Sequence, residues 1–221
     1  MSPLTIFQKT VDPAVSGAVP GTGDSPPGGL AGDGPGQQPA FAAGVEPEAI
    51  CALDTIQQQM ERLEQGTRRL AVQLRLELQP EWLWAALTDY ANLHRFIPNL
   101  SRSHLLWRRG NRVGLDQVGT QQFCGLQFSA QVELELEELR EHGELRFRMV
   151  KGDFRRFEGL WRVDRDQRST RLLYILTVQG KPGMPIGLIE QRLQQDLACN
   201  LRGVQQEAMR RFLAVGTPSR H

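Results

Sequence analysis

The sequence lacks an excess of charge of either sign, and it lacks any long apolar run. Its 26 basic and 25 acidic residues give a formal net charge of +1 over 221 residues. This balance argues against a nucleic-acid binder, which would carry a basic excess. No apolar run approaches the roughly 20 residues of a membrane-spanning helix, and the first ten residues lack the apolar core of a signal peptide. We therefore expect a cytoplasmic protein without a membrane span, and peripheral membrane contact stays open.

Cysteine and paired histidines are also scarce. The three cysteines, Cys51, Cys124 and Cys199, are far apart and odd in number, which fits neither a disulfide framework nor a zinc site. A reducing compartment is the natural interpretation. His104 and His142 have no second histidine at ligand spacing, so the sequence predicts no metal site and no cofactor.

Large apolar residues are few in the first 45 residues, which are dominated by Gly, Pro, Ala and Ser. Burial in such a segment cannot offset the entropy of ordering it, so we predict a disordered tail over 1–45. A helical apolar period then predicts a helical linker over 46–66, which either docks on the domain or pairs with a partner. Residues 67–214 form the expected domain. The apolar positions of the linker are Ile50, Leu53, Ile56, Met60 and Leu63.

Apolar and polar residues alternate in seven segments of the domain, which is typical of half-buried strands. The first covers 69–78, and the clearest covers 126–136, whose outward positions are polar and acidic. Between the first two strands, Pro80 begins a helical stretch that Pro98 ends. We expect two short helices there, with Asp89 as the cap of the second. The remaining strands are expected within 100–109, 112–123, 145–149, 157–163 and 172–178.

One long amphipathic helix closes the domain. Apolar residues three or four apart predict a helix from Met184 to Leu213 with one buried face and a polar opposite face that includes Asp196. At about 1.5 Å per residue this helix is about 45 Å long, so a broad surface must cover it. The expected fold is α+β, a curved antiparallel sheet of about seven strands wrapped on the helix, with the two short helices at one mouth of a cavity. The apolar face consists of Ile186, Ile189, Leu193, Leu197, Leu201, Val204, Ala208 and Phe212.

Three runs of residues carry a family resemblance. They are WAALTDYANLHRFIPNL from Trp84 to Leu100, GDFRRFEGLW from Gly152 to Trp161, and DLACNLR from Asp196 to Arg202. These runs resemble the START-like (SRPBCC) superfamily, in particular its polyketide cyclase/dehydrase and coenzyme Q-binding group, over roughly residues 67–213. The resemblance implies a helix-grip fold. It also implies a hydrophobic tunnel between the sheet and the last helix, holding a lipid, an isoprenoid quinone or a polyketide-like molecule.

The residues expected to line this cavity are mostly apolar. Alternation places Gln117 rather than Asp116 on the inner face, where it either contacts a ligand or makes a structural hydrogen bond. The aromatic residues are either walls for a planar ring or ordinary core. The predicted ligand-binding residues are Trp84, Phe96, Gln117, Phe128, Ala130, Phe147, Trp161, Tyr174, Leu193 and Leu197.

Catalysis by a cyclase would need polar groups inside the cavity. His94 lies close in sequence to Asp89 and Tyr90, but helix capping and surface exposure are the commoner roles for such residues, so no catalytic residue is assigned. The first hypothesis is therefore non-enzymatic binding of a hydrophobic small molecule. The alternatives are a polyketide cyclase or dehydratase, and an interaction module that recruits a protein partner through the tail and the predicted 46–66 helix.

Overall fold

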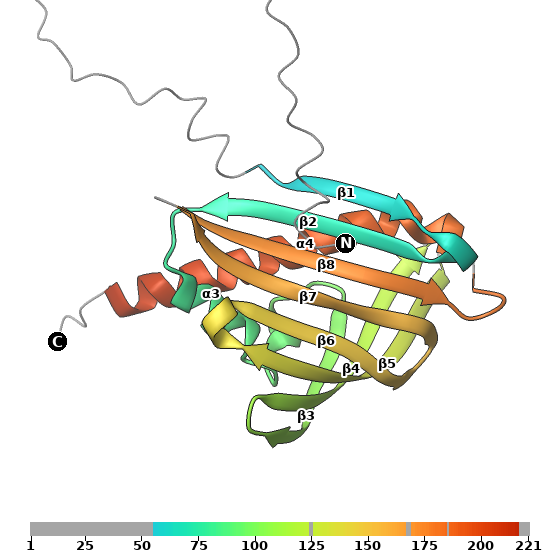
Figure 1. The fold of residues 1–221 in the computed structure, drawn as a ribbon, viewed down its shortest axis with the longest axis horizontal. Helices are drawn as coiled ribbons and strands as arrows, with labels where there is room; N and C mark the ends of the chain where they lie inside the picture. Colours follow the sequence, from blue (N-terminus) through green and yellow to red (C-terminus); the bar gives the residue numbers. More distant parts are fainter. Residues whose placement is uncertain (1–54, 124–125, 167–168, 185, 217–221) are drawn as a thin grey trace, which may run out of the picture.

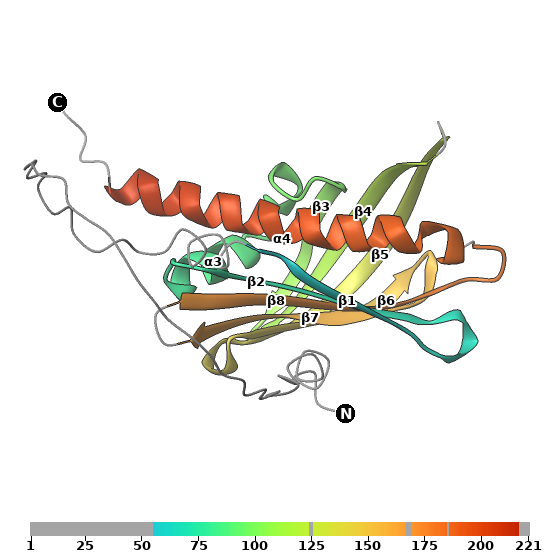
Figure 2. The same ribbon diagram turned by 90° about the horizontal axis from the view of Figure 1, so that it is seen from above.

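Eight strands form one antiparallel sheet, and the long helix α4 lies across one face of it (Figures 1 and 2). The computed structural model describes residues 55–123, 126–166, 169–184 and 186–216; for 121–123, 126–128, 186–189 and 191 it describes the backbone alone. The strand order is β1-β2-β8-β7-β6-β5-β4-β3. This is the predicted helix-grip arrangement, with eight strands instead of about seven.

The elements follow the alternating segments of the sequence closely. Left-handed glycines make two of the turns, Gly110 between β3 and β4 (φ 60) and Gly143 between β5 and β6 (φ 63). The strands are β1 Gln57–Arg62, β2 Arg68–Leu76, β3 Leu100–Arg109, β4 Arg112–Phe123, β5 Leu126–Leu139, β6 Glu144–Gly152, β7 Phe154–Asp166 and β8 Ser169–Gly180. The helices are α3 Pro80–Leu87 and α4 Ile186–Gly216, with short 3-10 turns η1 Glu64–Gly66, η2 Leu93–Arg95 and η3 Arg140–His142.

Strand β1 corrects the predicted helical linker. It pairs antiparallel with β2, and its Met60 lies opposite Leu70. Ile56 and Met60 are four residues apart, which places them on one face of a strand as well as of a helix, and both pack against the core. The spacing could not distinguish the two, and pairing with the otherwise free edge of β2 favours the strand. The folded domain thus begins before residue 67. Residues 1–54, with the predicted tail and the start of the linker, lie outside the described residues.

The core lies between the inner face of the sheet and the apolar face of α4. Of the predicted apolar face, Leu193, Leu197, Leu201, Val204 and Ala208 are all buried. Phe212, expected to be buried with them, is 44% exposed. The reason is that the last turns of α4 extend past the sheet (Figure 2), where Phe212 meets the edge of the Trp82 ring at 6.0 Å.

Polar contacts of Glu190 and Arg211 hold α4 in place near its two ends. Glu190 accepts hydrogen bonds from Arg62 of β1 at 2.8 Å and from Arg68 of β2. Glu207 accepts one from Arg211 Nε at 2.7 Å. Arg211 itself donates to the backbone of α3, at Ala85 O, at 2.9 Å. The long helix is therefore tied to β1 and β2 near its start and to α3 near its end.

A third contact holds the middle of α4 and corrects the expected exposure of Asp196. Asp196 is buried and accepts a hydrogen bond of 2.6 Å from Asn99 Nδ2, which lies just after η2. About two turns later, Gly203 lies so close to this segment that a Cβ there would be 2.1 Å from the carbonyl oxygen of Phe96. The segment between η2 and β3 therefore covers a side of α4 that the sequence pattern assigned to solvent.

Candidate functional site

Five aromatic rings form a continuous row on the inner face of the sheet. Trp161 of β7 and Tyr174 of β8 stack in parallel, with ring centroids 3.9 Å apart and planes 3° apart. Phe147 of β6 lies 6.1 Å from Tyr174 and 5.9 Å from Phe157, and Phe157 lies 5.2 Å from Phe154. Aromatic pairs at these separations attract each other beyond the burial of their area. The row is therefore a rigid apolar wall.

The strand register and one glycine create this row. Trp161 lies directly opposite Tyr174, and Phe147 lies opposite Gly159. A Cβ at position 159 would lie 1.9 Å from the carbonyl oxygen of Ile175 and 2.8 Å from Phe147 Cζ. Because glycine has no side chain, the Phe147 ring can lean over β7 and bridge the two ends of the row.

The Tyr174 hydroxyl is the polar group of the stacked pair that titrates. Tyr174 is 7% exposed, and burial raises the pKa of its phenol above the ordinary value of 10.0. A raised phenol pKa keeps the hydroxyl protonated and available as a hydrogen-bond donor at neutral pH.

The predicted residues on the helical side lie around the same core. Leu193 and Leu197 of α4 and Trp84 of α3 are buried, and Phe96, next to η2, is half-buried against the core. Phe147, Trp161 and Tyr174 belong to the aromatic row described above. The structure thus places these seven predicted residues in one apolar cluster. Their contact with a ligand stays a prediction.

The three predicted residues of β4 and β5 form a separate, less buried group. Gln117 is half-buried on the same face of β4 as the buried Leu115, as the alternation predicted, and its Nε2 donates to Ser103 Oγ at 3.2 Å. It therefore makes a structural hydrogen bond. Ala130 is half-buried two residues before the buried Val132 of β5. The side chain of Phe128 lies outside the described residues.

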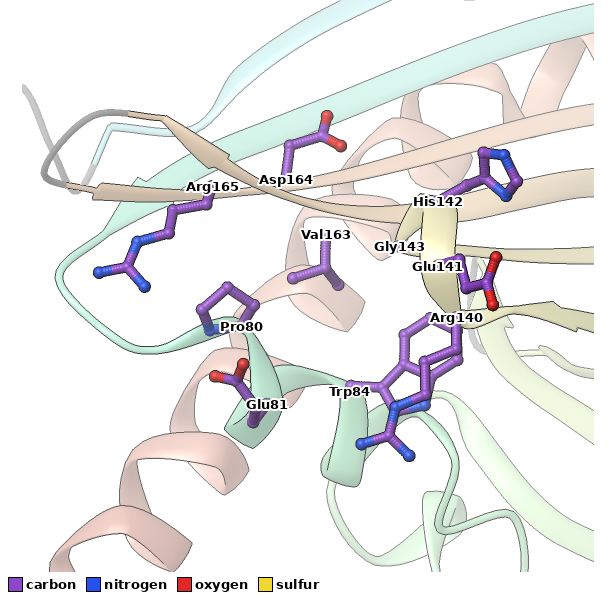
Figure 3. Close-up of a pocket in the computed structure, with 10 residues that line it drawn as sticks. All are labelled: Pro80, Glu81, Trp84, Arg140, Glu141, His142, Gly143, Val163, Asp164 and Arg165. Atoms are coloured by element: carbon purple, nitrogen blue, oxygen red, sulfur yellow. The ribbon is translucent and has the colours of Figure 1, made fainter.

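A pocket of about 360 Å³ opens at one end of the sheet, between the start of α3, η3 and the end of β7 (Figure 3). Trp84 and Val163 supply apolar walls, and Arg140 and Arg165 lie on opposite sides of the opening in this view. Of the ten predicted ligand residues, Trp84 alone lines this pocket. Its lining residues are Pro80, Glu81, Trp84, Arg140, Glu141, His142, Gly143, Val163, Asp164 and Arg165.

Sequence reasoning missed this pocket because its walls meet through long-range pairing. The amide N–H of Val163 donates to the carbonyl oxygen of Gly143 at 2.8 Å, which brings the end of β7 against the turn before β6. No pattern in the sequence places the turn at Gly143 beside α3. Val163 is two residues from Trp161 on the same face of β7, so the pocket lies beside the end of the aromatic row.

The residues considered for general-base catalysis do not converge. His94 is exposed, whereas Asp89 accepts a hydrogen bond of 2.6 Å from Arg211. Tyr90 points elsewhere, since its hydroxyl donates to Glu138 Oε1 at 2.7 Å. Asp89 also does not cap η2 as expected; Asn92 occupies that position, without a side-chain capping bond.

The described residues contain neither a metal-binding cluster nor a membrane-spanning helix. Within 55–123, 126–166, 169–184 and 186–216, no three His, Cys, Asp or Glu residues are grouped so that they could hold a metal ion. Among the helices of that part of the chain, none has the length and apolar character needed to cross a bilayer.

A twisted antiparallel sheet gripping one long terminal helix defines a START-like, helix-grip protein. Residues 76–202 match the family described as polyketide cyclase / dehydrase and lipid transport, and because this is more than half of the chain, the protein belongs to that family. The START-like resemblance noted in the sequence is thereby confirmed. None of the curated proteins matches the chain in sequence.

Solved structures of low sequence identity share the fold. A STAR-related lipid transfer protein from Xanthomonas axonopodis is 15% identical with a TM-score of 0.62, covering 70% of this chain and 93% of its own. The Zhui aromatase/cyclase from a Streptomyces species is 14% identical with a TM-score of 0.59, covering 69% and 99%. A protein from Thermus thermophilus is 21% identical with a TM-score of 0.55, covering 67% and 99%. These likenesses concern the fold alone.

Proposed function

We propose that this protein binds a hydrophobic small molecule, without transforming it, between the inner face of the sheet and α4. The observation that carries the proposal is the row of five aromatic rings on that face, from Phe154 at one end to Trp161 at the other. Small-molecule sites are lined mainly by such apolar and aromatic side chains, with few polar groups. A lipid, an isoprenoid quinone and a polyketide-like compound all fit this chemistry.

The cyclase alternative has support from the family description and from the shared fold of the Zhui aromatase/cyclase. A proton-transfer group must reach the substrate, and His94 is exposed while Asp89 is bound to Arg211. A substrate whose conversion is abolished by His94→Ala or Asp89→Asn, with ligand binding intact, would favour the enzyme and contradict our proposal.

The direct test is extraction of the purified protein with organic solvent and identification of the bound compound by mass spectrometry. A matched pair of variants locates the site. Ala130→Phe adds a ring on the inner side of β5, whereas Ser129→Phe adds the same ring at an exposed neighbouring position. We expect the compound to be lost from Ala130→Phe and retained by Ser129→Phe, with both variants folded.

The outcomes separate the possibilities. If Ala130→Phe keeps the compound, Ala130 does not line the site. If the wild-type protein yields no compound and binds no apolar probe, the proposed function is wrong. Overpacking of a filled core would instead lower the stability of Ala130→Phe by about 1–3 kcal/mol, which a thermal melt detects.

A further inference from the structure

The two tyrosines of the chain are both buried, yet their hydroxyl groups are in opposite situations. The hydroxyl of Tyr90 donates to Glu138 Oε1 at 2.7 Å. The hydroxyl of Tyr174 has no hydrogen-bond partner in the described part of the chain. Nearly all buried polar groups in folded proteins have a partner, so an unpaired buried hydroxyl needs an explanation.

The Tyr174 hydroxyl is unpaired but not fully enclosed. Some fully buried side-chain atoms of the described residues have no hydrogen-bond partner. They are Gln59 Oε1, Arg171 Nε and Asn200 Oδ1. The Tyr174 hydroxyl is also unpaired, but it is not one of these enclosed atoms, and Tyr174 keeps 7% of its surface exposed. The same reasoning applies to the indole N–H of its stacked neighbour Trp161. Two hydrogen-bond donors on one aromatic pair are thus without a protein acceptor in the described part of the chain.

We propose that the Tyr174 hydroxyl is the polar anchor of the ligand and donates a hydrogen bond to a carbonyl oxygen on an apolar ring compound. This inference rests on the proposed function and narrows the ligand class within it. The surrounding aromatic rings favour a ring over a flexible chain, because ring pairs gain contact energy at the separations found here. A donor without a protein acceptor favours a ligand that carries oxygen over one that carries none.

The test compares two probes of the same shape with and without oxygen. Acetylnaphthalene carries a carbonyl, and isopropenylnaphthalene carries a CH₂ group in its place. Tyr174→Phe removes the hydroxyl and keeps the ring that stacks on Trp161. Tyr90→Phe is the matched control, since it also removes one buried tyrosine hydroxyl, but outside the aromatic row. Affinities are measured by titration of the intrinsic tryptophan fluorescence of the full-length protein.

We expect Tyr174→Phe to weaken acetylnaphthalene binding about 3- to 10-fold, the usual contribution of one hydrogen bond, and to leave isopropenylnaphthalene within about twofold. Tyr90→Phe should change neither affinity by more than about twofold. The infrared carbonyl band of bound acetylnaphthalene should lie at lower frequency in the wild type than in Tyr174→Phe. This shift reports the hydrogen bond directly, and a change of packing alone would not produce it.

Every other outcome contradicts either the anchor role of Tyr174 or the proposed function. If Tyr174→Phe weakens both probes equally, or neither, or leaves the carbonyl band unmoved, the anchor role is wrong and the proposed binding function stands. If neither probe binds the wild type, the proposed function fails, and the inference fails with it. A thermal melt of Tyr174→Phe accompanies the titration, and we expect no loss of melting temperature, because no protein hydrogen bond is removed.

Discussion

Replacing Leu201 by Ala tests whether burial of one apolar face holds α4 on the sheet. Leu201 is 0% exposed in the middle of the helix. Gly203, in the same turn, already touches the Phe96 backbone, where a Cβ would lie 2.1 Å from the carbonyl oxygen. That contact lies on the side of α4 away from Leu201, about 200° around the helix. Movement of α4 into the space left by the removed atoms is limited instead by the hydrogen bonds of Glu190 to β1 and β2 and of Asp196 to Asn99. We therefore expect the upper part of the range for buried leucines, a loss of about 3–5 kcal/mol in the free energy of unfolding.

The matched control is Leu213→Ala on the same helix, where the side chain is 59% exposed. It should change the free energy of unfolding by about 0.5 kcal/mol or less. Urea denaturation followed by circular dichroism gives both values. A thermal melt should show a drop of roughly 6–20 °C for Leu201→Ala, at about 2–4 °C per kcal/mol for a domain of this size. Equal losses in the two variants would refute the assignment of the buried face.

Two further predictions concern the row and one end of α4. Gly159→Ala should lower the free energy of unfolding by about 1–3 kcal/mol and change the near-UV circular dichroism of the aromatic row, because the new Cβ meets Ile175 O and the Phe147 ring; an unchanged spectrum would contradict the close approach. Hydrogen bonds from Arg210 and Arg211 lower the pKa of Glu207 from 4.5 to about 2. Its contribution to stability is thus present above about pH 4.5 and is lost as the pH falls toward about 2. The stability difference between wild type and Glu207→Gln, from urea midpoints, should therefore shrink between about pH 6 and about pH 3, and a constant difference would argue against it.

The strands and the long helix were predictable because their burial patterns repeat within single segments. In β5, Val132, Leu134 and Leu136 are buried, as strict alternation requires. The apolar face of α4 was predicted on the same basis. Strand β1 was not, because the spacing of Ile56 and Met60 fits a helix as well as a strand, and only pairing with β2 distinguishes them.

The sequence predicted which residues belong to the candidate site, but not which of them contact each other. Alternation placed Trp161 and Tyr174 on the inner face, but their stacking depends on the register between β7 and β8. The hydrogen bond between Asn99 and Asp196 joins residues 97 positions apart, so no pattern within a short segment of the sequence predicts it. For the same reason the unpaired hydroxyl of Tyr174 could be identified only after every neighbouring element was in place.

Polar contacts outside the aromatic row hold α4 on the sheet. An empty volume in a core costs roughly 24 cal/mol per Å³. A helix held by apolar packing alone would therefore move toward the sheet until any cavity was closed. Here Glu190 and Asp196 bind partners on β1, β2 and the segment after η2, and Arg211 binds Ala85 O of α3, none of them a residue of the aromatic row. These contacts fix the helix without requiring the rings of β6, β7 and β8 to pack tightly against it. For the proposed binding function, substitutions along the row would therefore change the ligand while the polar contacts preserve the fold.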